Sequence, residues 1–300
     1  MLFPVSGVEA PVWLPVLVAF IISTFTSMGG VTGAFILLPF QVSVLGFTSP
    51  AVSPTNLIFN ITAIPSGVYR YLKEKRFVFP LLFAITMGTF PGTIIGVIIR
   101  AKYLPDPKNF KLFAGIVLVY IAYRLLKDIF GNSKPANNIP TADKPADFRV
   151  SNARFSLRRV SFSFGRQNYS VPTMPLSIFC FFVGIVGGIY GIGGGSIIAP
   201  VLIVQFGLPV FAIAGVTLAD TFISSVNGVI FYTVLGPYFA PDGVATQPDW
   251  LLGASFGIGG FIGIYLGTRL QKFIPAKFIK AILAISVTFI SIKYIISFFN

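Results

Sequence analysis

The sequence predicts an all-α polytopic membrane protein with two inverted repeats, each a glycine-broken helical hairpin followed by three transmembrane helices. Of its 300 residues, 55% are hydrophobic and only 10% are charged, which is not the composition of a soluble globular chain. A spanning helix needs about 20 apolar residues, so the chain has room for about eight to ten membrane segments. An internal duplication, described below, is typical of secondary transporters.

The apolar segments are separated by short polar turns and by one long polar stretch. Residues 131–173 are rich in Asn, Pro, Ser and Arg and are interpreted as a mobile basic linker loop. This loop divides the chain into a first membrane repeat, 1–130, and a second, 174–300. The Lys and Arg bias of cytoplasmic loops predicts that the linker lies in the cytoplasm. The apolar segments are 12–28, 31–46, 50–70, 77–99, 108–130, 175–190, 194–206, 209–235, 249–270 and 276–299.

The two repeats match over runs of residues at constant spacing. The register changes once, in the loop around residues 236–247, where a difference in length between duplicated halves is easily tolerated. Because the matches occur at only two spacings, we interpret them as a true duplication. Before the change, Gly30, Gly33, Pro39, Gly46 and Gly67 recur as Gly191, Gly194, Pro200, Gly207 and Gly228; after it, Gly88, Phe90, Gly92 and Gly96 recur as Gly259, Phe261, Gly263 and Gly267.

The charge pattern predicts that the halves are inverted. Residues 70–76 are strongly basic, whereas the corresponding region near Asp242 and Asp249 carries only acids. The first region is therefore expected in the cytoplasm and the second outside. Hairpins at 12–46 and 175–206, each entering and leaving on one side, give each half an odd number of crossings. This topology places four basic residues outside, against the usual bias: Arg100, Lys102, Lys108 and Lys111.

Composition excludes several classes of function. The net charge of +13 comes from basic residues in loops, which set topology, whereas nucleic-acid binding needs them clustered on a folded face. The chain has no His and one Cys, Cys180, so the usual metal ligands and catalytic bases are missing. We therefore predict no enzyme activity, no catalytic residue, no metal, no cofactor and no nucleic-acid partner.

Dense glycines interrupt the first apolar hairpin of each half. Residues 190–196 read Tyr-Gly-Ile-Gly-Gly-Gly-Ser, and residues 28–33 match them. A helix that restarts after such a break has free N–H groups and a positive dipole end, which together bind anions. The alternative is close helix packing, which we favour for the glycine triplets at 88–96 and 259–267. The candidate substrate-binding residues here are Gly29, Gly30, Thr32, Gly33, Gly191, Gly193, Gly194, Gly195 and Ser196.

Polar residues inside the apolar segments extend this candidate site. Asn56 and Asn60 share one helical face, and in the repeat register they match Thr217 and Thr221. Polar groups in a bilayer usually face a cavity or one another, so Asn56, Asn60, Thr217 and Asn227 are candidate lining residues. Hydrogen bonding between helices is the alternative, with equal weight for Ser224 and Ser225.

Asp220 is the only acid deep in an apolar run. An intramembrane acid is a functional candidate by default, here for proton coupling. The other interpretation is a structural hydrogen bond to a neighbouring hydroxyl or amide. Both interpretations stay open at this stage.

These motifs resemble the sulfite exporter family TauE/SafE, over nearly the whole chain outside the basic loop. The resemblance implies a prokaryotic plasma (inner) membrane transporter of sulfite or organosulfonates such as sulfoacetate. Pro91 has no equivalent in the second half, where Ile262 stands in its place. The motifs are the stretches Gly33 to Pro39 and Gly194 to Pro200, the Gly-Val pairs at 67–68 and 228–229, and Pro91, Gly92 and Gly96.

We therefore expect a secondary transporter that exports a small sulfur-containing anion by alternating access between the two halves. An inside-negative potential favours exit of an anion by about 2.3 kcal/mol per charge per 100 mV. The alternatives are an anion channel, or uptake of another small organic anion. The expected partners are the small anionic substrate and the lipid bilayer, and both a monomer and a homodimer stay open.

Overall fold

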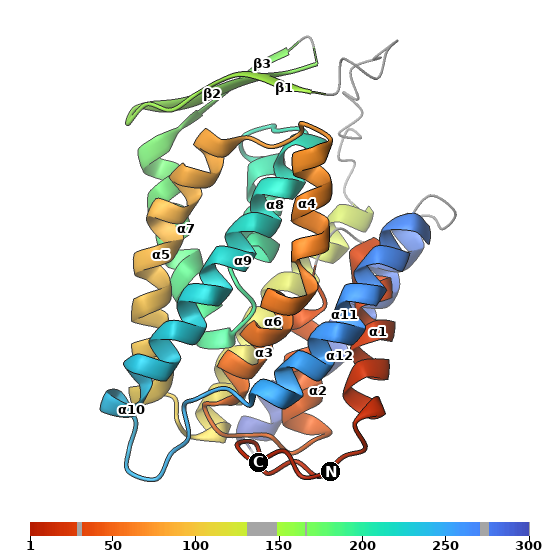
Figure 1. Ribbon diagram of the computed structural model, residues 1–300, viewed down its shortest axis with the longest axis vertical. Coiled ribbons are helices and arrows are strands. Elements are labelled where there is room, and N and C mark those ends of the chain that lie inside the picture. Colours follow the sequence, from red (N-terminus) through yellow and green to blue (C-terminus); the bar gives the residue numbers. More distant parts are fainter. Residues whose placement is uncertain (29–31, 131–148, 166, 271–275, 300) are drawn as a thin grey trace.

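The computed structural model describes residues 1–28, 32–130, 149–165, 167–270 and 276–299. Most of them are helical, and the helices follow the apolar segments (Figure 1). The helices are α1 (Trp13–Met28), α2 (Ala34–Ser43), α3 (Val52–Ala63), α4 (Pro65–Lys73), α5 (Phe79–Lys102), α6 (Pro107–Phe130), α7 (Thr173–Tyr190), α8 (Gly195–Val204), α9 (Val210–Val234), α10 (Gly236–Phe239), α11 (Trp250–Leu270) and α12 (Ala276–Phe299). The strands are β1 (Val150–Arg154), β2 (Arg159–Phe164) and β3 (Gln167–Pro172).

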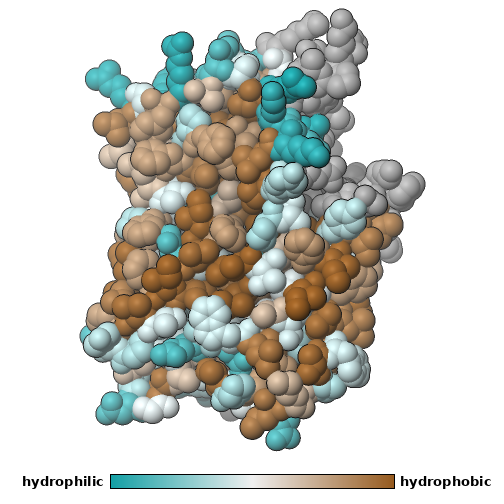
Figure 2. Space-filling model, in the orientation of Figure 1, coloured by the Kyte–Doolittle hydropathy of each residue, from teal (hydrophilic) through white to brown (hydrophobic). Residues whose placement is uncertain are grey.

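Within the described residues, five helices are long and apolar enough to cross a membrane: α5, α6, α7, α9 and α11. Shorter apolar helical stretches accompany them at Trp13–Ser27, Ala34–Ser43 and Leu283–Phe299. Large hydrophobic side chains such as Phe83, Phe182 and Phe289 are exposed on the outside of the bundle. Figure 2 shows apolar residues over the middle of the visible face and hydrophilic residues at its upper end. This distribution is that of a helical membrane protein.

The two hairpins enter the bundle from opposite ends. Helices α1 and α2 start and finish at the end where both chain termini lie, whereas α7 and α8 start and finish beside the sheet (Figure 1). Two long helix pairs then join the first half of the chain to the second. Helix α5 packs along α7, and α11 packs along α1. The starts of α2 and α8 therefore lie close together, with Thr32 within 3.5 Å of Ser196.

Glycines make both long helix pairs possible. A Cβ added to Gly92 would collide with the carbonyl oxygen of Phe181 on α7, and one added to Gly263 would lie 2.9 Å from the Cβ of Ser23 on α1. Real Cβ atoms do not approach other atoms so closely, so the helices could not keep this separation with larger residues. The predicted packing role of the triplets Gly88, Gly92, Gly96 and Gly259, Gly263, Gly267 is confirmed.

We expect Gly92→Ala to lower the thermal unfolding midpoint in detergent, because the added methyl forces α5 away from α7. Overpacking costs about 1–3 kcal/mol, against a helix-propensity gain of about 1 kcal/mol. The matched control is Gly67→Ala in α4, where the new Cβ would lie 3.3 Å from one methyl of Leu218. This control should leave the midpoint unchanged or higher. Equal midpoints for the two variants would contradict the packing role.

The segment expected at 50–70 is two helices rather than one. Helix α3 ends at Ala63 and α4 starts at Pro65, because a proline has no N–H to continue the helical ladder and clashes with the preceding turn. The corresponding segment of the second half, α9, is a single helix of 25 residues. The first half therefore differs here from the three unbroken spans that we expected.

The expected loop at 131–173 is wrong for residues 150–172, which form an antiparallel sheet in the order β1-β2-β3. Residues 131–148 lie outside the described residues. Alternation of polar and apolar residues along 159–164 is the signature of a half-buried strand. Val160, Phe162 and Phe164 are buried on the inner face of the sheet, and Phe155 beside β1 packs edge-to-face on Phe83 of α5, with ring centroids 4.9 Å apart.

Candidate functional site

The break between α7 and α8 requires glycine at two positions. Gly191 and Gly193 have φ angles of +83° and +71°, a left-handed conformation that other residues rarely adopt. Space is restricted as well. A Cβ on Gly191 would lie 2.9 Å from the Cα of Ser53 on α3, and one on Gly193 would lie 2.7 Å from the Cγ2 of Thr221 on α9. The chain therefore passes between α3 and α9 as bare backbone.

Two carbonyl groups at this break accept hydrogen bonds from α3. Nδ2 of Asn56 donates to the Gly191 carbonyl at 2.9 Å, and Nδ2 of Asn60 donates to the Ile192 carbonyl at 3.2 Å. At the start of α8, the Gly195 N–H donates to Oγ1 of Thr221 at 3.1 Å. Among the described residues, the N–H groups of Gly194 and Ser196 have no hydrogen-bond partner. The break therefore offers free backbone donors at the start of α8.

The start of α2 lies against this break. Oγ1 of Thr32 is 3.5 Å from Oγ of Ser196, and Nδ2 of Asn56 also donates to the Ala34 carbonyl at 3.0 Å. One amide group thus holds the first turn of α2 and the break before α8. The side chains of Thr32 and Asn56 are buried. Two helix starts, each the positive end of a dipole, therefore meet in the interior of the bundle. We call this place the cradle.

Asp220 on α9 lies beside the cradle and is fully buried. Its Oδ1 accepts hydrogen bonds from the hydroxyls of Thr89 at 2.7 Å and Thr86 at 3.5 Å, both on α5. Its Oδ2 has no partner. A Cβ added to Gly194 would lie 2.8 Å from this oxygen, so the unpartnered side of the carboxyl group faces the start of α8.

The other predicted residues divide into three groups. Asn60 is fully buried beside the cradle. Its Oδ1 has no partner and could still accept a hydrogen bond. The Thr217 hydroxyl donates to carbonyls of its own helix, and the half-buried Asn227 makes no hydrogen bond to the break, as far as the described residues go. Thr217 reaches the start of α8 through its backbone, since a Cβ added to Gly195 would lie 2.9 Å from the carbonyl carbon of Thr217. Gly33 packs against α1, and Gly29 and Gly30 lie outside the described residues.

The sequence is similar to known membrane transporters. The family model for the sulfite exporter TauE/SafE matches residues 15–294. The chain belongs to the TauE/SafE family. The chain is 23% identical over 288 residues to the probable membrane transporter protein YunE of Bacillus subtilis (strain 168), covering 93% of this chain and 96% of that protein. For the probable membrane transporter protein YjnA of the same organism, the identity is 22% over 273 residues, or 89% and 94%. No solved structure matches the chain significantly.

Membership of TauE/SafE establishes a multi-pass membrane transporter, not an enzyme. The described residues contain no group of three or more His, Cys, Asp or Glu side chains that could hold a metal ion. What the structure adds to the family assignment is therefore a set of backbone and hydroxyl groups inside the bundle, not a metal centre.

The sequence analysis missed two parts of this candidate site. Thr86 and Thr89, the partners of Asp220, lie among glycines that were assigned to packing alone. Their spacing of three, which puts them on one helical face, is the signal that could have found them. Ser53 was also missed: its Oγ donates to the Ile189 carbonyl at 2.8 Å, next to the break. No pattern in the sequence distinguishes it from other hydroxyls.

Arg100 belongs to a helix, although the sequence analysis placed it just beyond the apolar segment 77–99. It lies in the last turn of α5 and is fully buried. Its guanidinium lies over the ring of Phe110, 3.8 Å from the centroid. It donates to Oγ of Ser53 at 3.4 Å and to the carbonyls of Leu104 and Ser49. Helix α5 ends three residues beyond the predicted segment 77–99, and these groups solvate the charge in its last turn.

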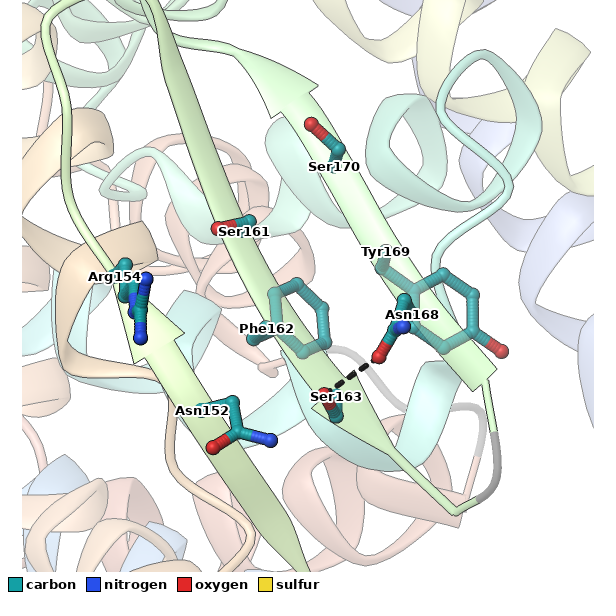
Figure 3. Close-up of a pocket in the computed structure, with 8 residues that line it drawn as sticks. All are labelled: Asn152, Arg154, Ser161, Phe162, Ser163, Asn168, Tyr169 and Ser170. Carbon is teal, nitrogen blue, oxygen red and sulfur yellow. Dashed lines mark hydrogen bonds between the residues drawn. The ribbon is translucent and has the colours of Figure 1, made fainter.

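A surface hollow of about 410 Å³ lies on the sheet (Figure 3). Ser161, Ser163 and Arg154 line it, and Oγ of Ser163 donates to Oδ1 of Asn168 at 2.7 Å. Partial burial raises the pKa of the neighbouring Tyr169 hydroxyl, which therefore remains a neutral donor. The strands that form this hollow lie at one end of the bundle (Figure 1), so the hollow is separate from the cradle. No residue predicted for substrate binding lines it.

Proposed function

We propose that this TauE/SafE protein is a secondary transporter of a small sulfur-containing anion, such as sulfite or an organosulfonate like sulfoacetate. The main support is that α2 and α8 start close together in the bundle interior, where Oγ1 of Thr32 and Oγ of Ser196 lie 3.5 Å apart. N–H groups and hydroxyls at a positive helix end bind oxyanions without a basic side chain. The proposed location is the plasma (inner) membrane of a prokaryote. The proposed direction is export, which suits an anion that accumulates inside the cell.

We further propose alternating access between two inverted halves, 1–130 and 174–300, with the linker 131–173 in the cytoplasm. Hairpins that open towards opposite ends of the bundle support this arrangement. So does the reciprocal packing of α5 on α7 and of α11 on α1. Rocking of one repeat against the other around a fixed central site is a common transporter mechanism.

An anion channel is the competing proposal, and the burial of the cradle favours the transporter. Thr32, Asn56 and Asn60 are at most 4% exposed. A site enclosed by protein requires a conformational change for entry and exit, whereas a channel needs a continuous path. Planar bilayer recording separates the two, because a channel would conduct far faster than a transporter turns over.

Thermal unfolding of the purified protein in detergent tests the substrate class. We expect sulfite, thiosulfate or sulfoacetate to raise the midpoint, because a ligand that binds only the folded state stabilises it by mass action, by about 2.7 kcal/mol at a hundred times Kd. Acetate, an anion without sulfur, is the comparison solute. The shift should disappear in Gly194→Val. Absence of a shift with any anion would count against the cradle as an anion site.

A further inference from the structure

The carboxyl group of Asp220 stands where a bound anion would meet it. It is fully buried, its Oδ2 is unpartnered, and that oxygen faces Gly194 at the start of α8. If the group were ionised, it would repel an anion held by the same helix start. If it were protonated, the O–H would be one more donor to that anion. The geometry thus makes the two charge states of Asp220 opposite in their effect on binding.

The neighbours of Asp220 offer no compensating positive charge among the described residues. Helix α5 contributes the hydroxyls of Thr86 and Thr89, and α8 contributes Gly194 and Ile198. The titratable neighbour on α7 is the Cys180 thiol. Helix α4 packs on α9 through Gly67, against Leu218, and through Tyr71, against Gly215, and neither contact brings a charged group. Without a cation nearby, a proton is the simplest way to neutralise this carboxylate in the membrane interior.

We infer that Asp220 takes up a proton when the anion binds and releases it when the anion leaves, so that one proton crosses with each anion. This inference rests on the proposed function and adds its coupling ion. The Asp220 carboxylate gains the proton at Oδ2 from water on the entry side and returns it to water on the exit side. For a monovalent anion the loaded step is electroneutral. Net flux then follows the combined anion and proton gradients, and the membrane potential no longer drives the exit of the anion.

Proton uptake on binding is the direct test. Methanesulfonate and sulfoacetate are added to the purified protein in weakly buffered detergent solution, with a pH indicator. Both probes keep a constant charge between about pH 6 and pH 8, because their acid groups titrate far below this range. We expect the wild-type protein to take up as much as one proton per bound anion, and to lose affinity about tenfold per pH unit once Asp220 ionises.

Asp220→Asn should bind both probes with no proton uptake and no dependence on pH. Asp249→Asn is the matched control, since Asp249 is also a buried carboxylate. Its Oδ2 accepts from the N–H groups of Val5 and Ser6, and its Oδ1 accepts from that of Leu252. Proton uptake should persist in this control. Proton uptake by Asp220→Asn that equals the wild-type value would overturn the inference.

Thr89→Val keeps the inference testable if Asp220→Asn does not fold. The Thr89 hydroxyl donates to Oδ1 and stabilises the ionised carboxylate, so its removal should let anion binding persist to higher pH. An unchanged pH dependence, or a requirement for Na⁺ at constant pH, would contradict proton coupling. Failure of the wild-type protein to bind any of the anions tested would instead refute the proposed anion site.

Discussion

Replacing Gly194 by Val should reduce anion flux at least ~100-fold, equivalent to a loss of about 2.7 kcal/mol. The new Cβ would lie 2.8 Å from Oδ2 of Asp220, 3.1 Å from the Cδ1 of Ile198 and 3.2 Å from the Cγ2 of Thr89. The branched side chain would fill the space in front of the unpartnered N–H groups and separate Asp220 from the anion. Counterflow in proteoliposomes, normalised to the amount of inserted protein, measures the effect.

Gly67→Val is the matched control for this substitution. Gly67 is on α4, and its added Cβ would approach only the tip of Leu218. Flux through this variant should stay within about twofold of wild type, because a flexible methyl group can move aside at little cost. Normal insertion with undiminished flux in Gly194→Val would mean that the anion does not bind at the start of α8.

The helices could be predicted because the membrane imposes a single solution on long apolar runs. Backbone groups in lipid must be paired within a helix, so runs such as 77–99 and 249–270 became α5 and α11 with small changes at their ends. The sheet was missed because the composition of 131–173 was weighed as a whole. Residues 159–164 alternate between polar and apolar side chains, and this local pattern predicts a strand better than the mean composition of the whole segment does.

The helix break between α7 and α8 could be predicted, from the dense glycines at 191–195. Prediction failed for groups whose role depends on which helices touch. Thr89 matters because α5 lies beside Asp220 of α9, and Ser53 matters because α3 lies beside the end of α7. Those neighbours are set by tertiary packing, about which a single sequence carries little information. The same reason explains why the burial of Arg100 was not predicted.

At Arg100, we expect a substitution that removes the positive charge to destabilise the fold less than a substitution that keeps it. Within the described residues, the guanidinium is buried without a carboxylate partner, and its planar fork reaches Ser53, Leu104 and Ser49 at once. A lysine ammonium is a point charge that cannot match this geometry. Arg100→Lys therefore leaves a buried charge with poor solvation, at an expected cost of about 3–5 kcal/mol.

Arg100→Met loses the same hydrogen bonds and the contact with Phe110, but it also removes the charge that has to be solvated. We expect a smaller cost, about 1–3 kcal/mol, from the carbonyl groups left unpaired. Unfolding midpoints in detergent should therefore rank wild type above Met, and Met above Lys. Lys102→Met is the control, since Lys102 is exposed two residues further along α5 and its loss should change little. If the Lys variant were the more stable of the two, the positive charge itself would stabilise this end of α5, and an anionic partner for it would have to be sought.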